Sequence, residues 1–153
     1  MMDEAREHIC FNLGRVMRRV QDFYEKRLSP FGMTPSQFFV FNALWAADGV
    51  FMSELGERVC LDSSTLTGII DRMERNGYVE RRSNPDDRRS VLVFLTATAQ
   101  EQGAHILKFA DELDAALREP YSVEEVGNFE RVLKSIADRL GVAAPTGGVL
   151  NAV

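Results

Sequence analysis

The stretch from residue 61 to residue 95 constrains this chain most, because it reads as one helix followed by one β-hairpin. Asp62 is a typical helix N-cap, and small polar residues follow it. We expect a helix over about residues 62–76, with Gly77 forming a tight turn after it. Residues 78–82 and 91–95 are rich in β-branched and aromatic side chains, and turn-forming residues lie in the polar loop 83–90 between them.

Residues placed at 100° intervals divide this helix into a packing face and a free face. The packing face contains Leu66, Ile69, Ile70 and Met73. The free face contains Ser64, Thr67, Gly68, Asp71 and Arg75, with Arg72 at its margin. Short hydroxyl side chains and a glycine let a helix approach base edges closely, whereas a merely solvated face more often carries Glu and Lys. We expect this face to read DNA bases; a plain solvent face is the alternative.

The expected hairpin is rich in arginine at its tip and flanks, which carry Arg81, Arg82, Arg88 and Arg89. Arginine suits both phosphate binding and insertion into a narrow minor groove. A free Asp87 would weaken the attraction to DNA, so we expect it to pair with an arginine, most simply Arg89. The alternative is a solvated charged turn.

A helix followed by a charged hairpin is the arrangement with which winged helix-turn-helix proteins hold DNA. Three segments make the resemblance specific, namely LDSSTLT at residues 61–67, DRMERNGYVER at residues 71–81 and NPDDRRSVLVFLT at residues 84–96. With the order of the flanking helices, they resemble the MarR (multiple-antibiotic-resistance regulator) family up to about Gly141. Asp87 and Arg89 occupy the family's Asp-x-Arg positions.

The resemblance implies a homodimeric bacterial or archaeal transcription factor, usually a repressor, whose hold on double-stranded DNA is loosened by a small ligand or by oxidation. The residues that we expect to contact DNA are Ser63, Ser64, Thr65, Thr67, Arg72, Arg75, Asp87, Arg88 and Arg89. The alternative is a helical protein-interaction dimer without DNA binding.

The formal net charge of -5 conflicts with DNA binding only until the chain is divided. Residues 72–95 contain six arginines and four acidic residues, a net charge of +2, whereas residues 96–153 contain nine acidic residues and five Lys or Arg, a net charge of -4. The positive charge therefore lies where a duplex would bind. We expect weak nonspecific affinity and strong salt sensitivity.

Amphipathic helices are predicted on both sides of this unit. Residues 3–28 carry an apolar stripe, residues 34–49 begin with a Thr34-Pro35-Ser36-Gln37 capping box, and a short helix over about residues 53–60 lacks a convincing cap. Thr96 caps a long helix to about Arg118, and Ser122 opens the last helix. The terminal stripes would expose contiguous apolar surface unless a second chain covered them. We therefore expect a twofold dimer with its reading helices about 34 Å apart on a near-palindromic operator.

The predicted fold class is mainly α with a small β-hairpin wing, a winged helix-turn-helix joined to a helical dimerisation region from both chain ends. We expect one domain over residues 1–153, with the DNA-binding part at 30–95, dimerisation helices at 3–29 and 96–140, and a flexible tail at 141–153.

An enzyme is not expected. The two histidines, His8 and His105, have no second ligand at metal-binding spacing, and neither a phosphate loop nor a nucleophile motif is recognisable. We predict no catalytic residues, no metal and no cofactor. The longest apolar stretch, residues 38–47, is far shorter than the roughly 20 residues of a membrane span, so we expect no membrane association and a cytoplasmic location.

The inducing signal has two candidate sites. Cys10, followed by Tyr24, resembles the reactive cysteine and tyrosine partner of the organic-hydroperoxide-sensing branch of the family, although Gly14 and Pro35 replace two expected aromatic residues. A buried structural cysteine is the alternative. Cys60 is expected to pack at the end of the third helix. A small aromatic effector would instead bind at an apolar seam formed by Phe11, Met33, Phe38, Phe41 and Trp45.

Overall fold

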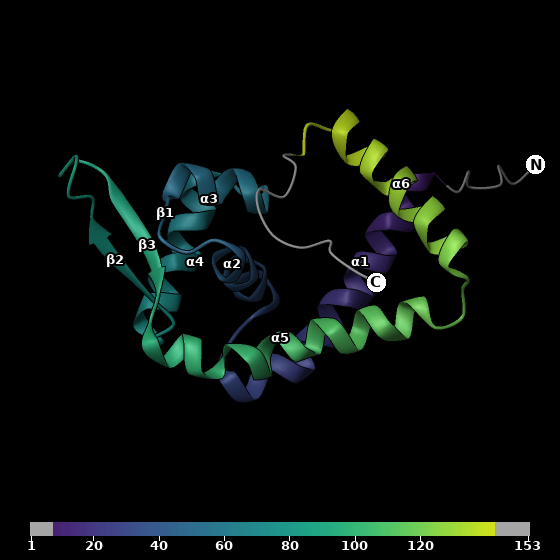
Figure 1. The fold of residues 1–153 in the computed structure, drawn as a ribbon, viewed down its shortest axis with the longest axis horizontal. Coiled ribbons are helices and arrows are strands. Elements are labelled where there is room, and N and C mark those ends of the chain that lie inside the picture. The colour runs from purple at the N-terminus through teal and green to yellow at the C-terminus, as the bar shows by residue number, and fades with distance from the viewer. Residues whose placement is uncertain (1–7, 143–153) are drawn as a thin grey trace, which may run out of the picture.

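The computed structural model describes residues 8–142, and the parts of the predicted first helix and tail that lie in residues 1–7 and 143–153 are outside this range (Figure 1). The chain order of the elements is α1 (Ile9–Leu28), η1 (Ser29–Phe31), α2 (Pro35–Ala46), β1 (Val50–Phe51), α3 (Met52–Val59), α4 (Ser63–Arg75), β2 (Val79–Ser83), β3 (Val91–Leu95), α5 (Ala97–Arg118) and α6 (Val123–Arg139). The mainly helical fold with a small hairpin is confirmed.

Four helices begin at the predicted cap residues Thr34, Asp62, Thr96 and Ser122, because each side-chain oxygen accepts a hydrogen bond from a free amide of the first turn. Thr34 and Ser122 form full capping boxes. Helix α3 has no side-chain cap, as its sequence predicts.

The sheet has three antiparallel strands in the order β1-β3-β2, one more than the predicted hairpin. Strand β1 pairs Val50 with Val93, so it ties the loop after α2 to the base of the hairpin. Asp48 strengthens this connection, because its Oδ1 accepts a hydrogen bond of 2.8 Å from the Leu95 amide. The hairpin thereby has a fixed base, and only its tip projects from the molecule (Figure 1).

The buried core lies mainly among α2, α3, α4 and the sheet, which we call the winged unit (residues 30–95), and α1 and α5 add Tyr24, Leu28, Ala99 and Ile106 to it. Phe38, Phe41 and Leu44 of α2 are buried, whereas Trp45 is 41% exposed. Its ring stacks on Phe41 and covers the backbone of α5 at Gly103, where an added Cβ would lie 1.9 Å from the indole. The Trp45 ring is therefore only partly covered by its neighbours.

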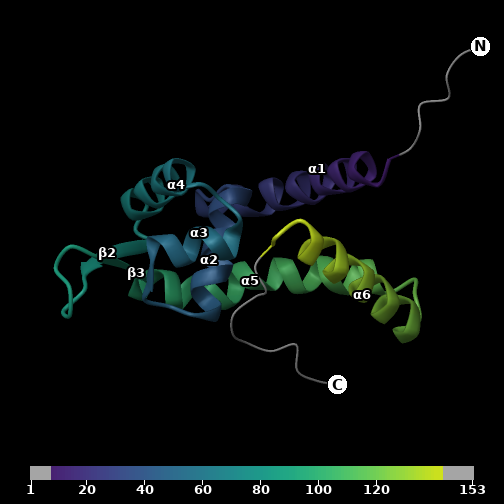
Figure 2. The same cartoon turned by 90° about the horizontal axis from the view of Figure 1, so that it is seen from above.

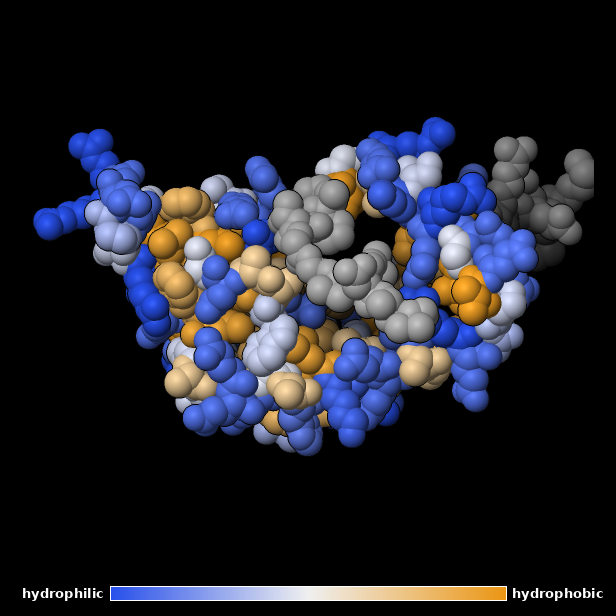
Figure 3. All heavy atoms as spheres, in the orientation of Figure 1, coloured by the Kyte–Doolittle hydropathy of each residue, from blue (hydrophilic) through white to orange (hydrophobic). Residues whose placement is uncertain are grey.

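Helices α1, α5 and α6 extend from one side of the winged unit, and the hairpin tip lies at the opposite end (Figures 1 and 2). The apolar stripes of α6 and of the first half of α1 are largely open, and α6 buries no residue at all, whereas the stripe of α5 is covered except at Leu117. Large exposed apolar side chains on these helices are Ile9, Phe11, Leu13, Val16, Met17, Leu117, Val123, Phe129, Val132 and Leu133. Figure 3 shows apolar side chains on one face, both over the winged unit and over α6. No helix within residues 8–142 combines the length and apolar character that a membrane crossing requires.

Candidate nucleic-acid interface

The central element of the candidate interface is α4, which buries one face and exposes the other, as the sequence predicts. Leu66, Ile69, Ile70 and Met73 are each no more than 3% exposed. The opposite face and the first turn are open to solvent, including Ser63, Ser64, Thr65, Thr67, Arg72 and Arg75. The apolar side of the helix thus anchors it, and its polar side is free to enter a DNA groove.

Asp62 organises the first turn of α4. Its Oδ1 accepts from the Thr65 amide at 2.9 Å and from Ser64 Oγ at 2.7 Å, while its Oδ2 accepts from Thr65 Oγ1 at 2.7 Å. These bonds, led by the one from the Ser64 hydroxyl, hold the pKa of the Asp62 carboxyl far below its ordinary range. The Asp62 carboxylate is therefore ionised throughout the neutral pH range.

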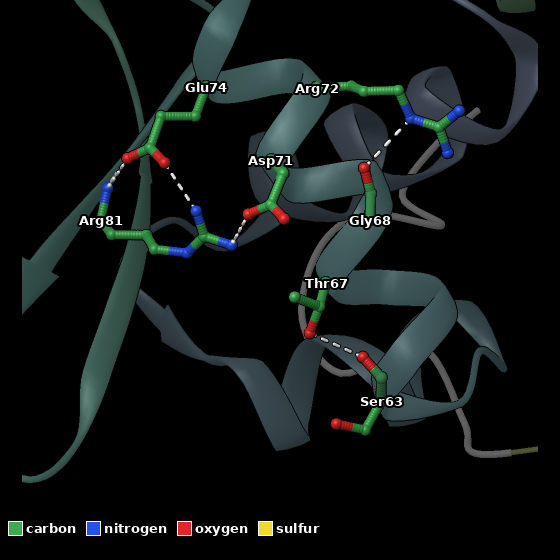
Figure 4. Close-up of polar contacts among 7 residues, drawn as sticks. All are labelled: Ser63, Thr67, Gly68, Asp71, Arg72, Glu74 and Arg81. Atoms are coloured by element: carbon green, nitrogen blue, oxygen red, sulfur yellow. Dashed lines mark hydrogen bonds and ion pairs between the residues drawn. The ribbon is translucent and has the colours of Figure 1, made fainter.

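Arg81 of β2 joins the hairpin to α4 (Figure 4). Its guanidinium donates to Asp71 Oδ1 and to Glu74 Oε2, both at 2.6 Å, and the Arg81 amide also donates to Glu74 Oε1 at 3.3 Å. Although burial of the guanidinium works against it, the bonds to Asp71 and Glu74 raise the Arg81 pKa. This clamp has no signal in the sequence, because ion pairs between distant elements leave no characteristic spacing. The clamp fixes the hairpin relative to α4.

Arg82 forms its contacts within the hairpin. It pairs with Glu80 on the same strand, and its guanidinium lies 4.2 Å from the centre of the Phe94 ring. Arg81 and Arg82 are therefore neutralised within the fold, although sequence counting includes both among the positive charges of the hairpin.

The loop at the hairpin tip is built by side chains that bind backbone amides. Asn84 Oδ1 accepts from the Asp86 amide at 3.1 Å, and Asp87 Oδ1 accepts from the Arg89 amide at 3.0 Å. The expected pairing of Asp87 with an arginine side chain is wrong, because the Asp87 carboxylate caps the Arg89 backbone instead. Asp87 shapes the tip and so directs Arg89 through its main chain.

Four arginines of this region keep their charge unneutralised. Arg75, Arg88 and Arg89 form no ion pair with any residue in the described part of the chain, and Arg72 donates only to the Gly68 carbonyl at 3.1 Å (Figure 4). Arg88 and Arg89 are exposed on the projecting tip, and Arg72 and Arg75 on α4. They supply the positive charge with which this surface would meet phosphates.

Helix α3 braces α4 from behind. Arg58 donates to the Ala47 carbonyl at 3.3 Å and to Glu54 Oε1 at 2.6 Å, so it ties α3 to the end of α2. Cys60 then adopts a left-handed conformation with φ of 55° and turns the chain towards α4. The Cys60 side chain is exposed, so the expectation that it packs at the end of the third helix is wrong for the single chain.

The two residues of the candidate redox site lie on one straight helix and do not meet within the chain. Cys10 and Tyr24 are 14 residues apart in α1, which corresponds to about 21 Å. Cys10 is exposed, so the alternative of a buried structural cysteine is wrong for the single chain. Tyr24 is buried and stacks on Phe38; burial, and then the charges of Asp111 and Asp114, raise its pKa. A contact between these side chains would require two chains.

The structure does not bring the five predicted ligand-pocket residues together. Met33, Phe38 and Phe41 are buried in the core, whereas Phe11 and Trp45 are exposed on α1 and at the end of α2. Helix α2 is apolar nearly all round, and such a helix is covered by its neighbours rather than left to line a cavity. One surface groove lies instead between α1 and α5 and includes Val16, Val20, Leu113 and Leu117.

Comparisons with known proteins agree with this geometry. The family model described as "MarR family" matches residues 33–91. The organic hydroperoxide resistance transcriptional regulator of Bacillus subtilis (strain 168) is 31% identical over 109 residues, which are 71% of each chain.

Two solved structures are similar over most of their length. A MarR transcriptional regulator from Methanosarcina mazei Go1 is 25% identical, with a TM-score of 0.79 over 88% of this chain and 99% of that one. Reduced AbfR bound to DNA is 29% identical, with a TM-score of 0.72 over 86% of this chain and 92% of that one. The winged unit is thus similar to a fold that has been solved on DNA.

Proposed function

The chain belongs to the MarR family, and on that premise we propose that it is a sequence-specific DNA-binding transcriptional regulator that acts as a homodimer, with repression as its mode of control. The observation that carries this proposal is the pairing of an exposed polar face on α4 with unneutralised arginines on the adjoining hairpin. In this assignment, α4 enters the major groove, and Arg88 and Arg89 contact phosphates or the minor groove beside it.

The dimer is proposed from the apolar surface of α1, α5 and α6. Val16 is 61% exposed and Phe129 is 62% exposed, on helices that lie away from the compact winged unit. A second copy that covered these faces would remove the apolar surface from water and relate the two α4 helices by a twofold axis. Two α4 helices about 34 Å apart would then match successive major grooves of a near-palindromic operator.

A gel shift and a fluorescence anisotropy titration on the DNA that flanks the protein's own coding region test this proposal. The Arg88→Ala, Arg89→Ala double variant should bind at least tenfold more weakly, because each chain loses two charge-assisted contacts. Arg131→Ala removes an exposed arginine from α6 and is the matched control. Sedimentation should give a dimer for all three proteins, and unchanged binding by the double variant would refute the assignment of the hairpin.

We propose an effector that acts through thiol oxidation at Cys10. The proposal rests on the exposure of this side chain and on the similarity to a relative named for organic hydroperoxide resistance. A Cys10 thiolate that attacks a hydroperoxide would take one oxygen and become a sulfenic acid, and the peroxide would leave as an alcohol. The added polar oxygen would lie where we expect the two chains to meet, and it would change the spacing of the two α4 helices.

A Cys10→Ser variant tests the oxidation step, with Cys60→Ser as the matched control because Cys60 is also exposed. An organic hydroperoxide should release DNA from the wild type and from Cys60→Ser but not from Cys10→Ser. Release from Cys10→Ser would exclude Cys10 as the switch. Release by a small aromatic compound without oxidant would favour the ligand-regulated alternative.

A further inference from the structure

Three hydroxyl groups on the exposed start of α4 have already committed their only proton within the helix. The hydroxyls of Ser64 and Thr65 donate to the Asp62 carboxylate, and Thr67 Oγ1 donates to the Ser63 carbonyl at 2.8 Å (Figure 4). A hydroxyl has one proton to donate and two lone pairs that accept. Each of these three side chains therefore faces an outside partner as a hydrogen-bond acceptor only.

The direction of these bonds is fixed by the chemistry of the inner partners. An ionised carboxylate and a backbone carbonyl have no proton, so the hydroxyls must be the donors. Ser63 provides an internal comparison, because its hydroxyl has no hydrogen-bond partner within residues 8–142 and remains free to donate or accept.

We propose that the start of α4 selects amino groups in the major groove, so that the operator positions facing Ser64, Thr65 and Thr67 carry adenine or cytosine rather than guanine or thymine on the contacted strand. Adenine N6 and cytosine N4 donate hydrogen bonds into the major groove, whereas guanine O6 and thymine O4 accept them. A keto oxygen opposite a committed hydroxyl would place two acceptors face to face. This inference rests on the proposed function and specifies which base chemistry it reads.

Asp62 is the positioning residue for this selectivity, since it acts through Ser64 and Thr65. An Asp62→Asn substitution keeps the helix start, because asparagine is as good an N-cap as aspartate. The oxygen that accepts from the Thr65 amide and the Ser64 hydroxyl would stay, and the new amide NH2 would replace Oδ2, which now accepts from Thr65 Oγ1. The Thr65 hydroxyl must then accept from this NH2, and its own proton becomes free to donate outwards.

Selection of bound duplexes from a randomised library tests this inference, with the full-length dimer and its variants. The positions that each residue reads are those whose preference disappears in Ser64→Ala, Thr65→Val or Thr67→Val. The wild type should favour adenine or cytosine there by roughly tenfold, which corresponds to about one net hydrogen bond. If a base preference disappears in Ser63→Ala, the wild type should not be restricted to adenine or cytosine at that position.

The Asp62→Asn variant gives the decisive readout. Its helix content by circular dichroism and its dimerisation should match the wild type, while guanine or thymine becomes accepted at the position read by Thr65 and the other two positions keep their preference. If Asp62→Asn instead loses affinity uniformly for all sequences, Asp62 acts only as a helix cap. If the wild type selects guanine or thymine at these positions, the inference is overturned. In both cases a specific operator is still enriched, whereas failure to enrich any duplex would refute the proposed function itself.

Discussion

The salt dependence of DNA binding should separate the arginines that the fold neutralises from those that it leaves free. Arg81 is held by two carboxylates, whereas Arg89 has no ion-pair partner within residues 8–142. Replacing either one by alanine removes the same formal charge. Only the loss of Arg89 should change the number of counterions that the protein displaces from DNA.

The magnitude follows from counting unneutralised charges. Each phosphate that a protein neutralises contributes about -0.9 to the slope of log K against log salt concentration. A dimer carries Arg89 twice, so Arg89→Ala should make the slope about 1.8 less negative. Between 50 and 200 mM salt, the variant would then lose about tenfold less affinity than the wild type loses.

Arg81→Ala should behave differently, because Asp71 and Glu74 already offset its charge. It should lower affinity at every salt concentration, since the hairpin loses its link to α4 and two carboxylates lose their cation. Its slope should remain close to that of the wild type. Anisotropy titrations of a labelled operator from 50 to 400 mM salt would measure all three slopes, with Arg131→Ala as the control. An equal loss of slope in Arg81→Ala and Arg89→Ala would refute the distinction between paired and free arginines.

Three further outcomes are expected. Gly103→Ala should lower the melting temperature by several degrees, because its Cβ would lie 1.9 Å from the Trp45 ring and overpacking costs about 1–3 kcal/mol; Gly127→Ala, whose Cβ meets nothing within 4 Å, should not lower it. Hydrogen bonds lower the folded-state pKa of Asp62, so its contribution to stability is complete above its unfolded pKa of about 3.9 and disappears as the pH falls. The difference in unfolding free energy between wild type and Asp62→Ala, measured by urea unfolding, should therefore be constant above about pH 5 and shrink below about pH 4. Phe129→Glu should shift the protein from dimer to monomer in sedimentation and weaken operator binding, whereas Arg131→Glu should leave the dimer intact if the apolar face of α6 is the interface.

The sequence predicts the helix starts well, because a cap depends on residues three positions apart. Thr34, Asp62, Thr96 and Ser122 each satisfy amides of their own first turn, so a local pattern contains the whole interaction. The buried face of α4 is equally local, since apolar residues that recur at helical spacing define it. The same reasoning locates the hairpin, whose observed strand β2 is shifted by only one residue from the prediction.

Two of the errors concern residues that are far apart in the sequence, and one is local. Strand β1 has only two residues and exists because Val50 and Phe51 pair with β3, so no local pattern announces it. The local error is the expectation that Asp87 pairs with an arginine side chain, because a carboxylate in a tight turn reaches a backbone amide more readily. The five predicted ligand-pocket residues do not come together in the single chain, because composition alone does not tell which apolar residues of α2 are covered.

The places where the winged unit joins the long helices indicate how a signal would reach DNA. The turn between α4 and β2 is held from two sides. The Tyr78 hydroxyl donates to the carbonyl of Phe31, the last residue of η1, at 2.6 Å, and Thr96 Oγ1, at the start of α5, donates to the Gly77 carbonyl at 2.6 Å. Asn76 adds a third bond of 3.2 Å to the Gly32 carbonyl.

These bonds connect the base of the hairpin and the end of α4 to η1, which directly follows α1, and to the start of α5, so both proposed dimerisation helices are linked to the winged unit. Because Arg81 also clamps the hairpin to α4, the reading helix and the wing should move as one body when either long helix moves. An effector therefore need not deform the DNA-contacting residues. It needs only to favour an arrangement of the long helices in which the two α4 helices no longer match successive major grooves. A preference of about 2.7 kcal/mol for that arrangement would weaken operator binding roughly a hundredfold.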